Sequence, residues 1–104
     1  MVELNDNNFK SEIINKKLVL VDFYATWCGP CGMQAQVLDR LENSRGLECD
    51  IVKVNVDESP NVSSEFGIDS IPTLMLFKDG KLVKKVVGVT SEEEICKMVE
   101  IYID

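Results

Sequence analysis

The apolar residues of this chain fall into short runs with the character of strands. Residues 18–24 are apolar on both faces apart from Asp22, as expected for a buried strand. Residues 51–56 and 73–77 form two further runs of this kind. Residues 82–87 form a fourth, and the preceding Asp79-Gly80 favours a tight hairpin turn. The last two strands are therefore predicted to be antiparallel neighbours.

Between these runs, apolar residues recur at the spacing of helices. A first helix is expected after the capping residues 5–8, and a second is expected to follow residue 31 and end near Gly46. The residues expected to face inward are Phe9, Ile13 and Ile14 on the first helix, and Met33, Val37, Leu38 and Leu41 on the second.

Two later helices have clear start signals. Ser59 is expected to cap a short helix that has Pro60 in its first turn and stops at residues 66–67. Ser91 and Glu94 have the spacing of a capping box. The last helix should present one apolar face made of Ile95, Met98, Val99 and Tyr102. This alternation, closed by a hairpin, predicts a mixed α/β sheet with helices on both sides.

The composition fits one domain over residues 1–104 and excludes several classes of function. The chain is 45% hydrophobic and 28% charged, and its net charge is -7. The acidic residues are scattered, so nucleic-acid binding is not expected. No stretch approaches the roughly 20 apolar residues of a membrane span. Residues 1–6 lack the basic start and apolar core of a secretory signal. We therefore expect a cytoplasmic protein without membrane association.

The clearest chemical signal is a pair of cysteines, Cys28 and Cys31, between the strand 18–24 and the following helix. At helical spacing their Cβ atoms lie roughly 5–6 Å apart. Disulfides accept Cα separations of roughly 4.4–6.8 Å, so the pair could open and close. Pro30 suits a first helical turn. Cys28 would then lie near free N–H groups and the positive end of the helix dipole, which favour a thiolate. This context is typical of a redox dithiol.

Other chemistries are less well supported. The chain has no histidine, which removes Cys-His and Ser-His nucleophiles and most mixed-ligand zinc sites. A zinc site is still an alternative, although one Cys-x-x-Cys supplies only two of four ligands. Cys49 and Cys96 have no partner spacing, so they are expected to act as small apolar residues. Regulatory oxidation of Cys96 is a further hypothesis.

Two charges interrupt runs that should be buried, Asp22 in the strand 18–24 and Lys53 in the strand 51–56. Each could lie on an edge strand and point to water. Alternatively, neighbouring strands bring the two charges together. Burial raises the pKa of an aspartate, and a nearby lysine partly lowers it again. Asp22 could then serve as general base for Cys31.

A proline, Pro72, stands at the entry to the strand 73–77. It could simply end an edge strand. Alternatively, the Ile71–Pro72 peptide is cis, as in some tight turns. Proline also leaves backbone groups of Ile71 unpaired, and these could accept an extended peptide by strand addition.

Taken together, these residues resemble the thioredoxin family over essentially the whole chain. The matching segments are residues 21–23, 27–31, 53–57, 67–68, 71–73, 77–80 and 87–88. The resemblance implies a thioredoxin fold, with a central mixed five-stranded sheet in the order 1-3-2-4-5 flanked by four helices, the fourth strand being antiparallel to the second. It also implies a cis Pro72 beside the dithiol, and that Asp22 and Lys53 form the buried pair of the family.

The chemistry implied by the resemblance is the reduction of protein disulfides. Cys28 would attack the disulfide of a client protein, and Cys31, activated through Asp22, would resolve the mixed disulfide. A thioredoxin reductase would restore the dithiol, so no bound cofactor is expected. No metal site is expected either. The protein is expected to be a monomer. The client would dock on a flat apolar surface made of Trp27, Gly29, Pro30, Ile71, Pro72, Val87 and Gly88. Plain core packing is the alternative for Trp27 and Val87.

Gly29-Pro30 is the version of the motif that reducing members of the family carry, which favours a reductase over a disulfide oxidase or isomerase. A noncatalytic binding module is a further alternative, but such modules commonly lose a reactive cysteine and this chain keeps both. Three positions depart from the family pattern. Gly32 replaces a common lysine, which should slightly weaken stabilisation of the Cys28 thiolate and change reductase docking. Gln36 replaces a frequent kinking proline, which should leave the helix straighter. Tyr24 replaces a frequent tryptophan. None of these changes removes a reacting group.

Overall fold

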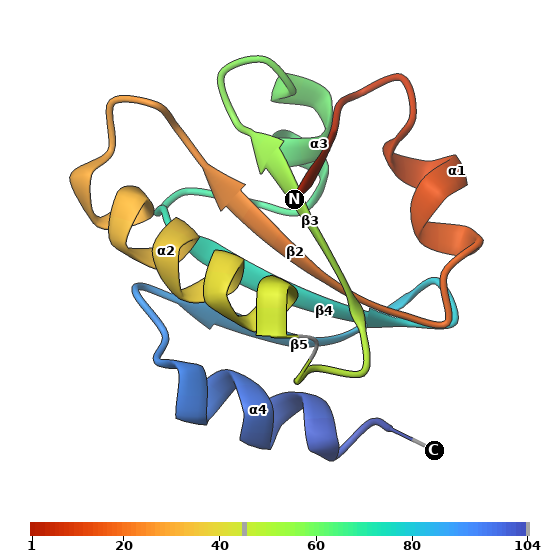
Figure 1. The fold of residues 1–104 in the computed structure, drawn as a ribbon. Coiled ribbons are helices and arrows are strands. Elements are labelled where there is room, and N and C mark those ends of the chain that lie inside the picture. Colours follow the sequence, from red (N-terminus) through yellow and green to blue (C-terminus); the bar gives the residue numbers. More distant parts are fainter. Residues whose placement is uncertain (45, 104) are drawn as a thin grey trace.

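Five strands form one sheet in the order β1-β3-β2-β4-β5 (Figure 1). The computed structural model describes residues 1–44 and 46–103. Its strands are β1 (Val2–Leu4), β2 (Leu18–Tyr24), β3 (Asp50–Asn55), β4 (Thr73–Lys78) and β5 (Lys81–Val87). β1 and β2 are parallel to β3, whereas β4 is antiparallel to β2 and β5 to β4. The predicted strand order is confirmed.

Four helices cover the two faces of this sheet. They are α1 (Phe9–Ile14), α2 (Gly29–Ser44), α3 (Pro60–Glu65) and α4 (Glu92–Glu100). α1 and α3 pack on one face, and α2 and α4 lie next to each other on the opposite face (Figure 1). Within the described residues, no helix is long and apolar enough to cross a membrane.

The sheet therefore separates two apolar cores, and β2 contributes to both. Val19, Val21 and Phe23 face the core under α1 and α3. Leu18 and Leu20 face the core under α2 and α4. Successive side chains of a strand point to opposite faces, so a strand covered on both sides must be apolar at nearly every position. This explains why residues 18–24 are apolar on both faces apart from Asp22.

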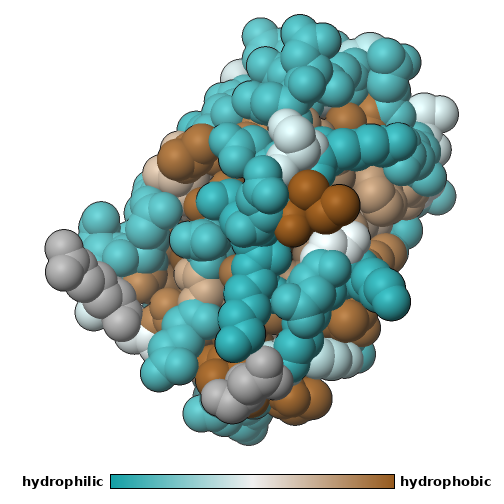
Figure 2. Space-filling model, turned by 90° about the vertical axis from the view of Figure 1, so that its right-hand side faces the viewer, coloured by the Kyte–Doolittle hydropathy of each residue, from teal (hydrophilic) through white to brown (hydrophobic). Residues whose placement is uncertain are grey.

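The hairpin between β4 and β5 forms where Asp79-Gly80 predicted it. Both residues have positive φ, 51° for Asp79 and 82° for Gly80. A two-residue turn of this kind matches the twist of the flanking strands. Viewed toward the side of α1 and this hairpin, most of the surface is hydrophilic (Figure 2).

Two side chains expected to face the core are instead exposed. Ile14 is 70% exposed and Met33 is 61% exposed. α2 buries Cys31, Gln34, Leu38 and Leu41, which lie three or four residues apart on one face, and Met33 lies off this face. The complete burial of Gln34 was not predicted, because a polar amide side chain is not expected in an apolar core.

α3 begins at Pro60 as predicted, but Ser59 does not cap it through its side chain. The carboxylate of Asp6 instead accepts hydrogen bonds from the backbone N–H of Asn61, at 3.1 Å, and of Val62, at 2.9 Å. Ser59 Oγ is buried without a hydrogen-bond partner among the described residues. The prediction that Ser59 caps α3 is therefore wrong. The Asp6 carboxylate caps this helix instead, 55 residues away from Asn61 in the sequence. At α4, the predicted cap is present, since Ser91 Oγ accepts a hydrogen bond from the Glu94 N–H.

Candidate active site

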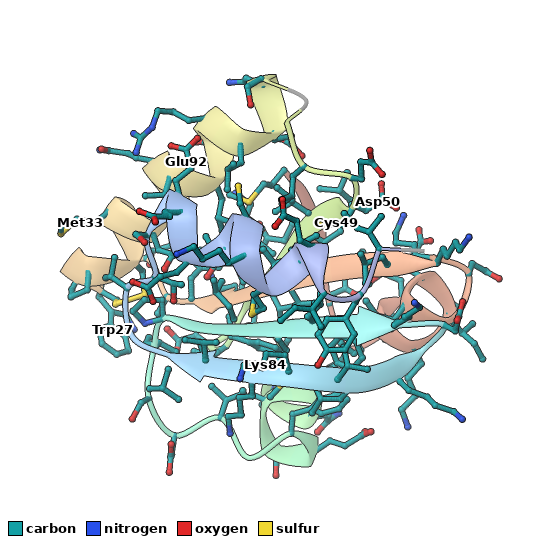
Figure 3. All side chains as sticks on the ribbon, turned by 90° about the horizontal axis from the view of Figure 1, so that it is seen from below. Trp27, Met33, Cys49, Asp50, Lys84 and Glu92 are labelled. Atoms are coloured by element: carbon teal, nitrogen blue, oxygen red, sulfur yellow. A yellow bond between two sulfur atoms is a disulfide. The ribbon has the colours of Figure 1, made fainter. Side chains whose placement is uncertain are left out.

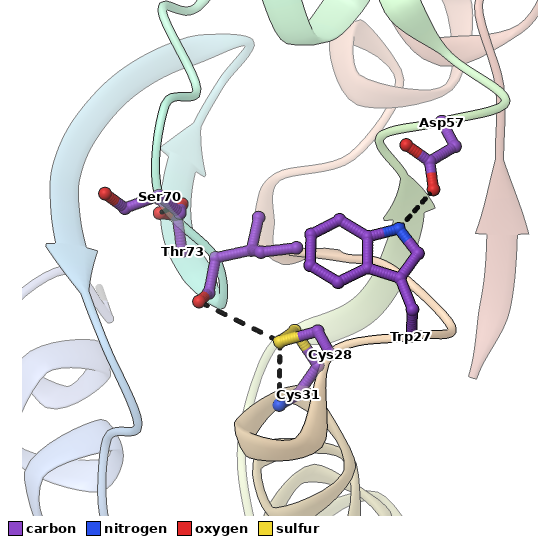
Figure 4. Close-up of a disulfide and its surroundings, with 7 residues drawn as sticks. Trp27, Cys28, Cys31, Asp57, Ser70 and Thr73 are labelled. Carbon is purple, nitrogen blue, oxygen red and sulfur yellow. Dashed lines mark hydrogen bonds between the residues drawn. A yellow bond between two sulfur atoms is a disulfide. The ribbon is translucent and has the colours of Figure 1, made fainter.

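The two cysteines of the motif lie where β2 leads into α2, and a disulfide joins them (Figure 4). Their Cα atoms are 5.3 Å apart. Cys28 precedes the first residue of α2 and is half-buried, whereas Cys31, in the first turn, is only 3% exposed. The Cys31 backbone N–H points at Cys28 Sγ, at an N···S distance of 3.3 Å. This donor and the helix N-terminus both favour negative charge on Cys28 Sγ once the disulfide is reduced.

The loop before β4 lies directly against the dithiol. The Ile71–Pro72 peptide is cis, as the resemblance implied. The Ile71 carbonyl oxygen lies 3.9 Å from Cys28 Sγ. The Gly88 N–H donates a hydrogen bond of 2.8 Å to the Pro72 carbonyl, which ties the end of β5 to this loop. Three segments far apart in sequence therefore meet around Cys28.

The residues around the dithiol differ in how much surface they offer. Trp27 is 70% exposed and Val87 is 56% exposed, so the core-packing alternative is wrong for both. Gly29 and Pro30 are also exposed, and Gly88 and Ile71 are half-buried. Pro72 is buried, so any contact with a partner there involves its surroundings more than its ring.

The sequence did not reveal the roles of two residues near the dithiol, Asp57 and Met33. Trp27 Nε1 donates a hydrogen bond of 2.7 Å to Asp57 Oδ2, which fixes the orientation of an exposed indole ring (Figure 4). The exposed Met33 lies at the same end of the molecule as Trp27 (Figure 3). In the sequence, Asp57 belongs only to the matching segment 53–57, and its contact with Trp27 spans 30 residues. No local pattern gives such a pairing.

Asp22 is the one charged side chain among the described residues that is almost completely buried, at 1% exposure. It lies opposite Lys53 in the register of β2 and β3, both interior strands, so the edge-strand interpretation is wrong. Asp22 Oδ1 has no hydrogen-bond partner within the described residues. Burial raises the pKa of Asp22 to about 7, and the Lys53 ammonium partly lowers it.

Lys53 is less buried than Asp22, and its side chain is 33% exposed. Its Nζ lies 4.0 Å from Glu3 Oε1 and 5.4 Å from the centre of the Tyr24 ring. The two charges are thus neighbours on adjacent strands, as the resemblance implied, but only the carboxylate is enclosed.

Cys49 and Cys96 are free and half-buried, and both pack against the core under α2 and α4. Burial, with a smaller contribution from Asp50, raises the pKa of Cys49 to about 12. Burial and the nearby Glu92 and Glu100 also raise the pKa of Cys96. Both thiols therefore stay protonated at neutral pH, in line with a role as small apolar residues.

Comparison with known proteins agrees with this geometry. The sequence model of the family described as Thioredoxin matches residues 1–101. The thioredoxin of Listeria monocytogenes is 44% identical over 101 residues, which cover 97% of each chain. The chain belongs to the thioredoxin family. Thioredoxin 1 of Synechococcus elongatus is 51% identical over 86 residues, which cover 82% of this chain and 80% of that one.

Solved structures give the same result. A mutant thioredoxin from Halobacterium salinarum superposes with a TM-score of 0.90 at 33% identity, covering 99% of this chain and 90% of that one. As a member of the thioredoxin family, the chain is a protein-disulfide oxidoreductase with Cys28 and Cys31 as its redox pair. Membership also implies that its partners are a reductase and client proteins.

Proposed function

We propose that Cys28 is the nucleophile that attacks client disulfides and that Cys31 is the thiol that releases the product. The observation that carries this assignment is the difference in access. Cys28 Sγ lies at the start of α2 and is partly exposed, whereas Cys31 is 3% exposed and lies behind it. A client sulfur can therefore reach Cys28 but not Cys31.

The reaction has two steps that conserve atoms and electrons. The Cys28 thiolate attacks one sulfur of the client disulfide; a mixed disulfide forms, and the other client sulfur leaves as a thiolate. The Cys31 thiolate then attacks Cys28 Sγ; the Cys28–Cys31 bond forms, the bond between Cys28 and the client sulfur breaks, and that sulfur leaves as a thiolate. The client becomes a dithiol when its two thiolates take up protons. Two electrons pass from the protein to the client. A thioredoxin reductase returns them, and no bound cofactor or metal takes part.

Asp22 accepts the proton of Cys31 in the second step. A proton acceptor works best when its pKa lies near the ambient pH. Burial raises the pKa of Asp22 to about 7, with Lys53 partly lowering it, which suits transfer at neutral pH. Lys53 acts on the reaction through this carboxyl and is therefore a positioning residue.

The client docks on the exposed residues around Cys28. We assign to this surface Trp27, Gly29, Pro30, Ile71, Pro72, Val87 and Gly88. The exposure of Trp27 and Val87 supports the assignment, because large apolar side chains left in water commonly mark a binding surface when they cluster. The hydrogen bond from Trp27 to Asp57 reduces the freedom that the indole would lose on binding. We further propose that the chain works as a monomer of one domain in the cytoplasm.

Insulin reduction by dithiothreitol tests the assignment of the two cysteines. We expect Cys28→Ser to abolish the acceleration, because no exposed nucleophile is left. Cys31→Ser, reduced and then freed of dithiothreitol before insulin is added, should accumulate a mixed disulfide with insulin, which mass spectrometry detects. Cys49→Ser is the matched control and should react like the unchanged protein. Unchanged turnover in Cys28→Ser would overturn the assignment.

Equilibration of the dithiol with glutathione separates a reductase from an oxidase. A reductase should have a reduction potential near or below that of the cytosolic glutathione pool, which is roughly -220 to -260 mV by extraction methods. A potential far above that range would instead favour disulfide formation in clients.

A further inference from the structure

Three charged residues form a row across the parallel half of the sheet. Lys53 on β3 lies opposite Glu3 on β1 and also opposite Asp22 on β2. Residues opposite each other in neighbouring strands have side chains on the same face. The Lys53 ammonium therefore lies between two carboxyl groups, one exposed to solvent on the outer strand β1 and one buried on the interior strand β2.

The outer carboxyl group is held in place by a second residue. Tyr24 donates a hydrogen bond of 2.9 Å from its hydroxyl to Glu3 Oε1, the same oxygen that lies 4.0 Å from Lys53 Nζ. The Tyr24 ring lies 5.4 Å from Lys53 Nζ, within the range of a cation–π interaction. Burial and the contact with Glu3 raise the pKa of Tyr24 to about 12, so the phenol stays a donor at any physiological pH.

We propose that Glu3 and Tyr24 are positioning residues that hold the Lys53 ammonium on the outer side of the sheet, and so set the pH at which Asp22 loses its proton. With its ammonium drawn outward, Lys53 compensates the burial of Asp22 only in part. The consequence for turnover depends on the proposed role of Asp22 as proton acceptor for Cys31, but the effect on the titration of Asp22 does not.

Few other charges act on Asp22 among the described residues. β4 places the uncharged Leu74 opposite it, and the Cys28–Cys31 pair at the start of α2 is neutral while the disulfide is formed. Glu58, which follows β3, acts on Tyr24. The charged and titratable groups to consider are therefore Lys53 on β3, Glu3 on β1, Tyr24 on β2, the Cys28–Cys31 pair on α2, and Glu58.

The test follows the carboxyl carbon of Asp22 by NMR as a function of pH, in the protein with its disulfide intact. We expect Glu3→Gln to lower the pH midpoint of Asp22 by about half a unit, because Lys53 is then free to approach it. Tyr24→Phe keeps the ring but removes the hydrogen bond, and should lower the midpoint by a smaller amount. Glu93→Gln, an exposed glutamate on α4, is the control for net charge and should leave the midpoint unchanged.

Glu3→Gln also removes a negative charge that could act on Asp22 directly. The Lys53→Met background separates the two routes, since coupling through Lys53 must disappear when Lys53 is absent. We expect Glu3→Gln to add no further shift in that background. An unchanged midpoint in Glu3→Gln would overturn the inference, as would an equal shift with and without Lys53.

A kinetic measurement distinguishes this inference from the proposed role of Asp22. The release step is followed with a preformed mixed disulfide between pH 5 and 9. If Asp22 accepts the proton of Cys31, the release rate falls at low pH as Asp22 becomes protonated. In Glu3→Gln, this fall should move to lower pH by the same amount as the NMR midpoint of Asp22. If Asp22→Asn leaves the release rate unchanged, the proposed role of Asp22 is wrong, while the titration results still decide the role of Glu3.

Discussion

Gln34 and Thr90 pair as two backbone segments of a sheet would. Gln34 Oε1 accepts a hydrogen bond of 2.6 Å from the Thr90 N–H, and Gln34 Nε2 donates one of 3.1 Å to the Thr90 carbonyl. Gln34 is fully buried and Thr90 is 3% exposed. The side chain thus satisfies both polar groups of a buried loop residue, which would otherwise have no partner. It fixes the β5–α4 loop, which begins at Gly88, against α2.

We expect Gln34→Leu to lower the free energy of unfolding by about 2–6 kcal/mol. The leucine fits the apolar surroundings, but it leaves the N–H and carbonyl of Thr90 buried and unpaired, at about 1–3 kcal/mol for each group. Urea denaturation measures this loss. Gln36→Leu, an exposed position on the same helix, is the control and should change stability by less than about 0.5 kcal/mol. Equal losses at the two positions would contradict the structural role of the amide.

Asp22→Asn should stabilise the protein at neutral and alkaline pH. Burial raises the pKa of Asp22 from 3.8 to about 7, with Lys53 partly lowering it. Between these values the folded state binds the proton and the unfolded state does not, so stability falls as pH rises through this window. Above pH 7, burial of the charged Asp22 carboxylate lowers the stability of the folded state by about 4 kcal/mol, the value for a shift of this size. Asparagine carries no charge, so the variant does not lose this stability.

The gain from Asp22→Asn should therefore approach about 4 kcal/mol near pH 8 and fade toward zero near pH 4. Urea denaturation at a series of pH values measures this profile. Asp39→Asn, on the exposed side of α2, is the matched control and should show no such dependence. A gain of the same size at every pH would show that the burial of charge is not its cause.

Local chemistry in the sequence was enough to predict the parts of the fold whose signals lie close together. The run 18–24, the Asp79-Gly80 turn and the Cys28–Cys31 pair each form within a few residues, and each is present. The three-residue β1 is too short to show periodicity, and it is stabilised by pairing with β3. Only the family resemblance predicted it.

The features that the sequence did not reveal depend on partners far away along the chain. In the sequence, Gln34 resembles a surface residue, and only the fold shows that it pairs with Thr90. Asp6 belongs to the capping residues before the first helix, and only the fold shows that it caps α3. Met33 has the spacing of a core residue, but the buried face of α2 is the one that carries Gln34 and Leu38, and Met33 lies off it. A helical pattern gives the face only when its phase is known.

Asp6→Ala should destabilise the protein more than Ser59→Ala. Asp6 accepts the hydrogen bonds of two free N–H groups at the start of α3, and removal of such a cap costs about 0.5–2 kcal/mol. Ser59 Oγ makes no hydrogen bond among the described residues, so its loss should be neutral or slightly favourable. Thermal unfolding of the two variants measures the difference. The reverse order would show that the local serine is the effective cap.

Gly32 offers a test of how charge acts on the dithiol. A Cβ added at Gly32 meets no atom within 4 Å, so the structure does not require glycine in the second turn of α2. Gly32→Ala should raise the free energy of unfolding by about 0.5–1 kcal/mol, because glycine loses more conformational freedom than alanine when a helix forms. Gly32→Lys should give a similar gain in stability and add a cation four residues after Cys28, which is one helical turn.

We expect only the lysine variant to alter the chemistry of Cys28. Its ammonium should stabilise the thiolate, so alkylation of the reduced protein by iodoacetamide should begin at a lower pH than in Gly32→Ala. The two variants should converge in 1 M salt, where the screening length falls to about 3 Å. If they react alike even at low salt, the position 32 side chain does not reach the Cys28 sulfur. If the difference persists in 1 M salt, the cause is a change of geometry and not of charge.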